Sequence, residues 1–159
     1  PRRQRQMCIR DRLIIDNIID PRNLGSCLRS AAVLGVDAVI INKHQCAPVN
    51  QVVHDVSSGG IELLNIFYVS NLINCLKHLQ DENIKVYGLS EHADKSYQNC
   101  NFENSTAIIM GSEEFGIRKK TAEKCDLLIN LSDNRNFKSF NVAVATGIIL
   151  SEVVRQRKC

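Results

Sequence analysis

Short, almost continuous apolar runs recur along the chain and are separated by helix-length segments. The runs occupy residues 13–18, 36–41, 66–69, 84–89, 106–110 and 125–131. A strand that is apolar at nearly every position is suited to a sheet covered on both faces, which is the usual environment of a parallel strand. Because these runs alternate with helical patterns, we predict an α/β fold with a mostly parallel sheet flanked by helices.

The segments between the runs carry helix signals. Helices are predicted at residues 23–35, 71–80, 117–124 and 141–154. Residues 48–64 begin as a helix that soon breaks, and residues 90–105 are predicted to form a polar loop. Asn23 is the expected N-cap of the first helix, since its side chain can accept from free N–H groups. Gly35 is the expected stop of that helix, because glycine readily adopts the left-handed conformation.

The last helix is apolar around most of its circumference. Small residues, Ala143, Ala145 and Gly147, alternate there with β-branched ones, and the polar Ser139 and Asn141 precede them. Such a helix is buried on several sides. Two interpretations remain open: a buried helix whose first turn faces a site, or a core helix simply capped by Ser139. Its apolar surface exceeds what one small domain is expected to cover, so we also expect a homodimer interface.

Composition narrows the function classes. The chain has 159 residues, 23% of them charged, and a net charge of +3, which permits a nucleic-acid partner without requiring one. No apolar run is long enough to cross a bilayer, so we expect no membrane association. The seven cysteines include no C-x-x-C pair and the four histidines show no ligand spacing. We therefore expect reduced, packing cysteines and no metal.

The amino-terminal residues differ in composition from the rest. Residues 1–12 contain five arginines and are predicted to form a basic N-terminal tail or linker remnant, with an RNA-binding arm as the alternative. Residues 13–159 are predicted to form a single domain.

The motifs typical of dinucleotide-binding enzymes, P-loop nucleotide-binding proteins and serine hydrolases are absent from the sequence. The chain has no G-x-G-x-x-G after its first strand, no Walker loop and no G-x-S-x-G. Gly111 follows the apolar run 106–110, at the position where an α/β sheet presents a ligand. We expect a ligand to lie against its bare backbone. The adjacent Glu113 and Glu114 are either an acid/base pair or partners of a helix dipole.

Three stretches taken together indicate a particular protein family more specifically than any single motif. They are Asn23-x-Gly25-x-x-x-Arg29-x-Ala31, Gly111-x-Glu113-x-x-Gly116 and Ser139-x-Asn141-Val142-x-Val144-Ala145, in this order, each after an apolar run. This arrangement resembles the SpoU (TrmH) family of RNA ribose 2′-O-methyltransferases, within the SPOUT superfamily, from about Leu13 to Arg157. The run from Gly147 to Arg157 is especially similar to members that methylate a guanosine in 23S ribosomal RNA.

The resemblance implies a fold, a reaction and a set of site residues. The C-terminal part would form a deep trefoil knot that binds S-adenosylmethionine, and a cytoplasmic homodimer would methylate a ribose 2′-hydroxyl of RNA. The residues that match the catalytic positions are Asn23, Arg29, Glu113, Ser139 and Asn141, and those that match the cofactor positions are Gly111, Leu131 and Phe140.

Departures from the family pattern leave alternatives open. Ser132 replaces a usual proline, Arg135 a glycine and Phe140 a leucine, so we expect an altered loop around the cofactor. The alternatives are a transfer-RNA methyltransferase, a catalytically silent RNA-binding member, or an α/β nucleotide-binding enzyme of another class. With no tryptophan and 5% aromatic residues, the chain is expected to bind RNA weakly.

Overall fold

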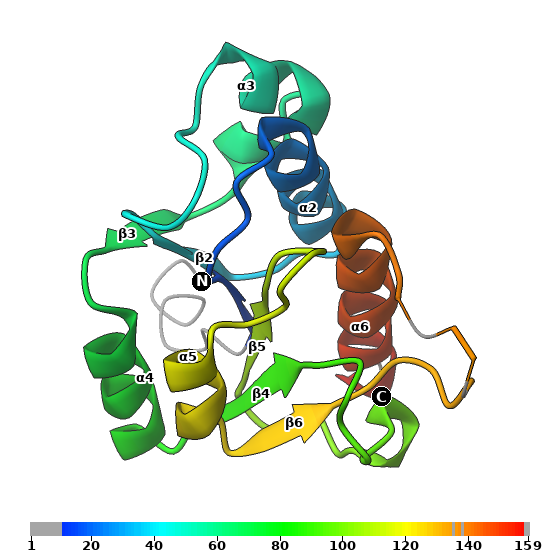
Figure 1. Ribbon diagram of the computed structural model, residues 1–159. Helices are drawn as coiled ribbons and strands as arrows, with labels where there is room; N and C mark the ends of the chain where they lie inside the picture. The colour runs from blue at the N-terminus through cyan, green and yellow to red at the C-terminus, as the bar shows by residue number, and fades with distance from the viewer. Residues whose placement is uncertain (1–10, 135, 138, 158–159) are drawn as a thin grey trace.

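One parallel sheet organises the structure, a computed structural model that describes residues 11–134, 136–137 and 139–157 (Figure 1). Within these residues the strand order is β3-β2-β1-β5-β4-β6, and each neighbouring pair is parallel. The strands are β1 (Asp11–Ile15), β2 (Ala38–Asn42), β3 (Ile66–Val69), β4 (Lys85–Leu89), β5 (Thr106–Met110) and β6 (Leu127–Ile129). The predicted parallel α/β class is confirmed.

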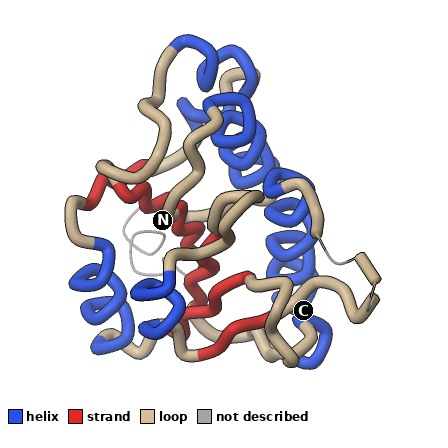
Figure 2. Tube along the Cα trace, in the orientation of Figure 1, coloured by secondary structure: helices blue, strands red, loops and turns tan. Residues whose placement is uncertain are grey.

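Helices cover both faces of this sheet (Figure 2). They are α2 (Pro21–Val33), α3 (Gln51–Ser57), α4 (Leu72–Asp81), α5 (Lys119–Lys124) and α6 (Val142–Arg157), with short 3₁₀ turns η1 (Gly60–Leu63) and η2 (Tyr97–Asn99). Residues of α2, α3 and α6 belong to one core cluster, and α4 belongs to another on the opposite face. No helix of the described residues has the length and apolar character needed to cross a membrane.

Alternate residues of the central strand enter different cores. Leu13 and Ile15 pack with the α2–α6 cluster, whereas Ile14 between them packs with the α4 cluster. All three side chains are fully buried. Because successive side chains of a strand point to opposite faces, two covered faces require apolar residues at every position.

The start of α2 differs from the prediction. The N-cap is Asp20, whose carboxylate accepts a hydrogen bond from the Arg22 amide at 2.9 Å, and Pro21 occupies the first turn. Proline suits that place because it has no N–H to satisfy and its φ is already helical. The prediction that Asn23 caps this helix is therefore wrong, and its side chain is available for another role. Gly35 has a φ of +70° just beyond the helix, as predicted for a stop.

Helix α6 is capped by Asn141, not Ser139. The Asn141 Oδ1 atom accepts from the amides of Ala143 at 2.9 Å and Val144 at 3.3 Å. Its buried positions are Val142, Ala145, Thr146, Ile149, Leu150 and Val153. Val144 on the other side is 52% exposed. The expectation of burial on several sides is thus wrong within a single chain, because α2 covers only one side of the helix.

The end of α6 is tied to distant parts of the chain. Arg157 Nε donates to the Phe102 carbonyl at 2.8 Å, and its guanidinium also contacts the Asn104 carbonyl and the Asp11 carboxylate. Only 10% of the Arg157 side chain is exposed. The end of α6 therefore joins β1 to the β4–β5 connection.

The predicted tail overlaps the sheet by two residues. Strand β1 begins at Asp11, so Asp11 and Arg12 are part of it. The remaining arginines of the predicted tail lie outside the described residues.

Replacing Arg157 tests this tie. We expect Arg157→Met to lower the free energy of unfolding by about 3 kcal/mol, because it removes a cationic donor from the Asp11 carboxylate and from two carbonyls. Urea unfolding measures the change. Arg155→Met is the matched control, since Arg155 pairs with Glu152 on the same helix and joins no distant element. Equal effects of the two substitutions would contradict the assignment.

Candidate functional site

A pocket opens at the carboxyl edge of one half of the sheet. Its walls are the ends of β4, β5 and β6 and the first turn of α6, and its volume is about 240 Å³. The three predicted cofactor residues, Gly111, Leu131 and Phe140, all line it, as do Glu113 and Ser139. The loop after β5 forms a large part of the wall and carries Gly111 and Glu113.

The backbone of Gly111 lies directly against the end of its own loop. A Cβ atom on Gly111 would lie 2.2 Å from the Gly116 carbonyl carbon and 2.3 Å from the Ile117 amide nitrogen. The loop therefore folds back onto the bare backbone of Gly111. The chain itself fills the space beside the Gly111 Cα atom, and contact between a ligand and the rest of the Gly111 backbone, which lines the pocket, stays a prediction.

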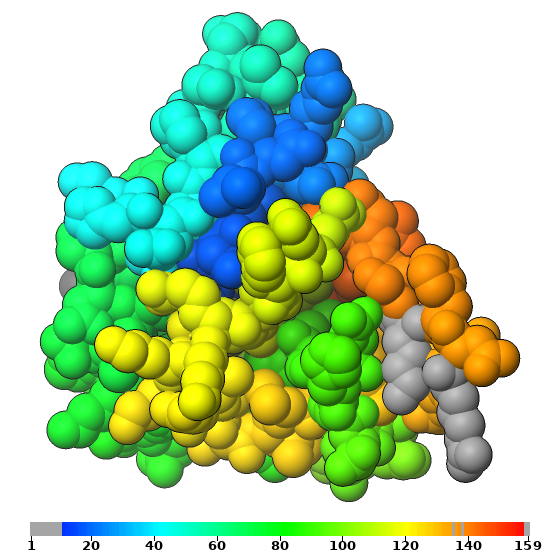
Figure 3. Space-filling view, viewed as in Figure 1, coloured from blue at the N-terminus to red at the C-terminus, as the bar shows by residue number. Residues whose placement is uncertain are grey.

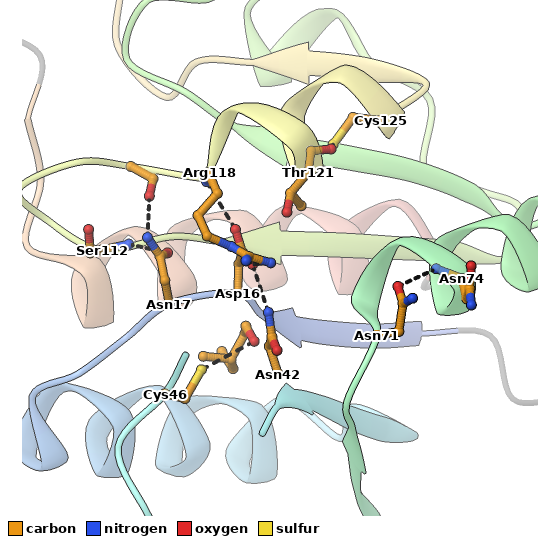
Figure 4. Close-up of polar contacts among 12 residues, drawn as sticks. Asp16, Asn17, Asn42, Cys46, Asn71, Asn74, Ser112, Arg118, Thr121 and Cys125 are labelled. Atoms are coloured by element: carbon orange, nitrogen blue, oxygen red, sulfur yellow. Dashed lines mark hydrogen bonds and ion pairs between the residues drawn. The ribbon is translucent and has the colours of Figure 1, made fainter. Parts of the chain in front are cut away.

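An ion pair between a buried carboxylate and a partly exposed arginine holds the far end of this loop. Asp16, at the carboxyl end of β1, is completely buried. Its carboxylate accepts from Arg118 Nε at 2.9 Å and from the Arg118 amide at 3.0 Å, and Asn42 Nδ2 donates to it at 3.2 Å. Figure 4 shows Asp16 between the other two side chains. A buried carboxylate needs such partners, since an unpaired charge in the interior is costly.

Asn17 closes the near part of the same loop. Its Oδ1 atom accepts from the Ser112 amide at 3.0 Å, and its Nδ2 donates to the Gly116 carbonyl at 3.0 Å. The Gly116 amide in turn donates to the Ser112 carbonyl at 2.8 Å. Asp16 and Asn17 together fix both ends of residues 112–118, and we call this set of contacts the β1 clamp.

The β1 clamp occupies the point where the strand order reverses. From β1 the sheet continues to β2 and β3 on one side and to β5, β4 and β6 on the other. Open α/β sheets form a crevice at such a point, beyond the carboxyl ends of the strands. Here the contacts of the clamp fill that crevice between β1 and β5, and the pocket lies beside it, toward β4 and β6.

Three of the predicted catalytic residues meet at the edge of the pocket. Asn141 Nδ2 donates to Glu113 Oε1 and, at 3.2 Å, to Asn23 Oδ1. Glu113 Oε1 also accepts from the Val142 amide at 3.0 Å. The carboxylate thus lies at the N-terminus of α6, where the helix dipole favours a negative charge. Of the two interpretations of Glu113, the dipole partner is the observed one, with α6 as the helix.

Arg29 and Ser139 lie apart from this trio. Ser139 is exposed and lines the pocket. Arg29 is exposed in a shallow groove between α2 and α6, whose other residues are mostly small or apolar. The side chain of Arg29 makes no hydrogen bond or ion pair with another described residue. Within a single chain, therefore, the predicted catalytic set is only partly assembled.

The buried cysteines are packing residues, as predicted. Those described are free thiols. Burial raises the pKa of Cys27 to about 11 and that of Cys125 to about 12. Such thiols are protonated at neutral pH and are poor nucleophiles. The described residues also include no group of three or more side chains that could hold a metal ion.

The loop with the sequence departures is closed by its own side chains. Ser132 Oγ accepts from the Asn134 amide at 3.2 Å, and Asn134 Oδ1 accepts from the Asn136 amide at 2.9 Å. Serine can accept this bond where the usual proline could not. Arg135, the second departure, lies outside the described residues. Phe140, the third, is 40% exposed at the pocket.

Sequence reasoning missed two parts of the site. The first is the β1 clamp. Asp16 and Asn17 are polar residues at the carboxyl end of an apolar strand, and that position could have indicated a site. The second missed part is residues 89–92, which also line the pocket. Leu89 ends the predicted strand 84–89 and residues 90–92 directly follow it, so the rule that ligands bind at the carboxyl ends of strands would have included them.

The family can now be identified. Residues 11–151 match the model of the SpoU rRNA Methylase family. The chain belongs to this family. It is 41% identical over 145 residues to the 23S rRNA (guanosine-2′-O-)-methyltransferase RlmB of Xanthomonas campestris, and 42% identical over 145 residues to that of Escherichia coli. Each match covers 91% of this chain, and 58% and 60% of the respective relative.

Solved structures of this family share the fold. The SpoU methyltransferase AviRb from Streptomyces viridochromogenes aligns with a TM-score of 0.86 and 25% identity, over 97% of this chain and 63% of that one. The same enzyme in complex with AdoMet aligns with a TM-score of 0.81 and 26% identity, over 92% of this chain and 57% of that one. The resemblance inferred from the three motifs is confirmed.

Gly111→Ala tests how the loop packs. We expect the free energy of unfolding to fall by about 3 kcal/mol, because the added methyl overlaps the backbone of residues 116–117. Gly147→Ala is the control, since its nearest neighbour would be 3.9 Å away. The control is expected to gain up to about 1 kcal/mol in helix propensity. A neutral Gly111→Ala, measured by urea unfolding, would contradict the close approach.

Asp16→Asn tests the β1 clamp. The amide keeps the shape but weakens the charged hydrogen bonds to Arg118, which is partly exposed, so we expect the free energy of unfolding to fall by about 2 kcal/mol. We also expect new proteolytic cleavage within residues 112–118. The control is Asp55→Asn, an exposed carboxylate that accepts from Gln51 on its own helix. Unchanged stability and cleavage in Asp16→Asn would show that the ion pair does not hold the loop.

Proposed function

We propose that this chain transfers the methyl group of S-adenosylmethionine to a ribose 2′-hydroxyl of RNA, with a guanosine of 23S ribosomal RNA as the substrate. The observation that carries the proposal is the trio of Asn23, Glu113 and Asn141 at the edge of the pocket at the strand ends. The names of the 41–42% identical relatives support the substrate. The chain spans about 60% of their length, so the complete reaction is proposed by analogy with them.

The pocket fits the chemistry of this cofactor. An adenosyl group needs apolar walls for its ring, and Leu89, Leu131 and Ile117 supply them. The polar ribose and amino-acid parts need hydrogen-bonding groups, which Ser90, Glu91 and Ser139 offer. Gly111, Leu131 and Phe140 are the residues that would hold the cofactor. The solved complex of AviRb with AdoMet supports the same ligand.

The side chains would position the ribose and stabilise charge. When bound, S-adenosylmethionine would supply an electrophilic methyl group for the ribose 2′-oxygen, and the hydroxyl proton would pass to solvent. Arg29 would bind the neighbouring phosphate and stabilise the negative charge that develops on that oxygen. We assign it no role as a base, because arginine is hardly ever deprotonated in proteins.

The trio would act mainly by orientation. Glu113 holds Asn141 and the first amide of α6, so its carboxylate fixes the helix start that borders the pocket. Asn141 in turn orients Asn23, which leaves the Asn23 amide group to contact the ribose. Holding the reacting groups in line supplies a large share of the barrier reduction. Ser139, exposed at the pocket, would contact the same substrate.

A second copy of the chain would complete the site. The groove between α2 and α6 contains Arg29 together with Val144, Gly147 and Ile148. These small and apolar residues form the uncovered side of α6 and are suited to a helix packing against them. A homodimer formed through this groove would bury them and bring Arg29 to the substrate.

The C-terminal knot belongs to the same proposal. The β4–β5 connection contacts the chain on both sides of the loop that leads to α6. The Tyr97 amide donates to the Asn130 carbonyl at 2.9 Å, and Gln156 Nε2 donates to the Cys100 carbonyl at 3.0 Å. These contacts support a chain threaded through that connection. Tracing residues 130–141 in an experimental density map would test it.

The function is tested by mapping 2′-O-methyl groups in ribosomal and transfer RNA from cells with and without this protein. We expect one 2′-O-methylguanosine of 23S RNA to depend on it. If only transfer RNA contains a 2′-O-methyl group that requires this protein, the substrate is transfer RNA. RNA binding without any dependent methyl group would identify a silent member. A cytoplasmic location, where ribosomal RNA is modified, follows from the proposal and stays a prediction.

Arg29→Ala separates binding from chemistry. We expect the affinity for S-adenosylmethionine to stay nearly unchanged, because Arg29 does not line the pocket. Methyl transfer should fall by at least about a hundredfold, as for the loss of one electrostatic stabiliser. Lys77→Ala, on the opposite side of the sheet, controls for the loss of a surface cation. Normal turnover in Arg29→Ala, measured with labelled cofactor, removes this residue from the mechanism.

Val144→Asp tests the homodimer. A charge on the uncovered side of α6 should convert the dimer into a monomer, as measured by light scattering. Val33→Asp is the control, because Val33 is 78% exposed at the end of α2. A wild-type mass of one chain at every concentration would overturn the dimer.

A further inference from the structure

An exposed aromatic residue stands at the edge of the pocket. Phe115 is 78% exposed and lines the pocket together with Phe140, which is 40% exposed. The whole chain has only five phenylalanines and no tryptophan. Phe137, in the loop beside Phe140, is a third and is 76% exposed. Three of the five phenylalanines therefore lie at the pocket or in the loop next to it.

The backbone that carries Phe115 is fixed on both sides. The Phe115 amide donates to Ser112 Oγ at 3.1 Å, and the next amide, that of Gly116, donates to the Ser112 carbonyl at 2.8 Å. Asn17 bonds both Ser112 and Gly116, as part of the β1 clamp. In Figure 3 the yellow-green loop of residues 111–116 lies on the surface between the blue α2 and the orange start of α6. A rigid turn thus presents a large apolar ring to solvent.

We propose that Phe115 is a stacking platform for an unpaired base of the RNA substrate. The inference rests on the proposed function, because it places the base next to the ribose that reacts. Glu113, two residues earlier in the same loop, contacts Asn141 at the edge of the pocket. A ribose that reaches this edge brings its own base or a neighbouring one to the loop. Unpaired bases stack on aromatic side chains in most single-stranded RNA recognition.

Two lysines near Phe115 favour RNA as the occupant of this surface. The net charge of +3 gives only a weak long-range attraction to RNA, so stacking would add to the affinity that individual phosphate contacts supply. Lys119 and Lys120, both exposed, follow the loop at the start of α5 and are positioned for the phosphates beside a stacked base. The competing occupants of Phe115 are a second copy of the chain and the cofactor itself. A second copy predicts that Phe115→Ala lowers the dimer mass, and the cofactor predicts that Phe115→Ala lowers cofactor affinity.

The test is a titration of fluorescein-labelled single-stranded oligoadenylate, and of the same oligonucleotide with abasic sites, in the presence of S-adenosylhomocysteine. We expect Phe115→Ala to weaken oligoadenylate binding by at least about fivefold and to leave abasic binding unchanged. Phe115→Tyr and Phe115→Trp should restore it. Phe67→Ala, an accessible ring at the edge strand β3 that is 53% exposed, should have no effect.

The salt dependence separates stacking from phosphate contact. Phe115→Ala should leave the slope of log affinity against log salt unchanged, since stacking releases no counter-ion. Lys119→Ala and Lys120→Ala should each reduce that slope by about one.

Several outcomes overturn the proposal. Phe115→Ala and Phe67→Ala could weaken oligoadenylate binding equally, or Phe115→Ala could weaken binding of the abasic oligonucleotide as much as that of oligoadenylate. The weaker binding could be accompanied by a fall in dimer mass or in cofactor affinity, or the wild-type chain could fail to bind oligoadenylate. Failure of the proposed function is a separate result. It would appear as absent methyl transfer by the wild type, whatever Phe115→Ala does to oligonucleotide binding.

Discussion

The ion pair between Asp16 and Arg118 is the contact on which the candidate site depends. It joins the end of the central strand β1 to the far end of the loop that follows β5. The carboxylate is completely buried and takes donors from two sides, so it holds one orientation. With Asn17 it sets the path of residues 112–118. That path brings Gly111 to the pocket wall, Glu113 to α6 and Phe115 to the surface.

The same side chains that are candidates for chemistry also hold elements together. Glu113 and Asn141 both accept from free amides in the first turn of α6, and Asn141 also bonds to Asn23 on α2. Loop, α6 and α2 therefore meet at one hydrogen-bonded trio beside the pocket. A group fixed in this way loses little freedom when a substrate binds, which is the physical meaning of a preorganised site. It also means that a substitution within the trio changes structure and reactivity together.

Much of the fold could be predicted from local patterns. Strands β3 and β5 occupy residues 66–69 and 106–110, as predicted, because continuous apolar runs ended by polar or glycine residues leave little ambiguity. The predicted N-cap of α2 is wrong because Asp20-Pro21 already supplies a cap and a first helical residue ahead of Asn23. The convergence of Asn23, Glu113 and Asn141 was implied by family resemblance and is observed. Asp16 and Arg118 are 102 residues apart, and no local pattern relates them. The use of glycine at 111 likewise depends on where the chain returns, which only the folded loop reveals.

The most direct test of this account is the amide hydrogen exchange of the loop after β5. The amides of Ser112, Gly116 and Arg118 donate respectively to Asn17, the Ser112 carbonyl and Asp16. If the β1 clamp fixes the loop, these three amides exchange slowly in the protein without ligands, at rates close to those of the β5 amides. Exchange as fast as in an unstructured peptide would contradict the claim that the ion pair and Asn17 build the site before any ligand binds.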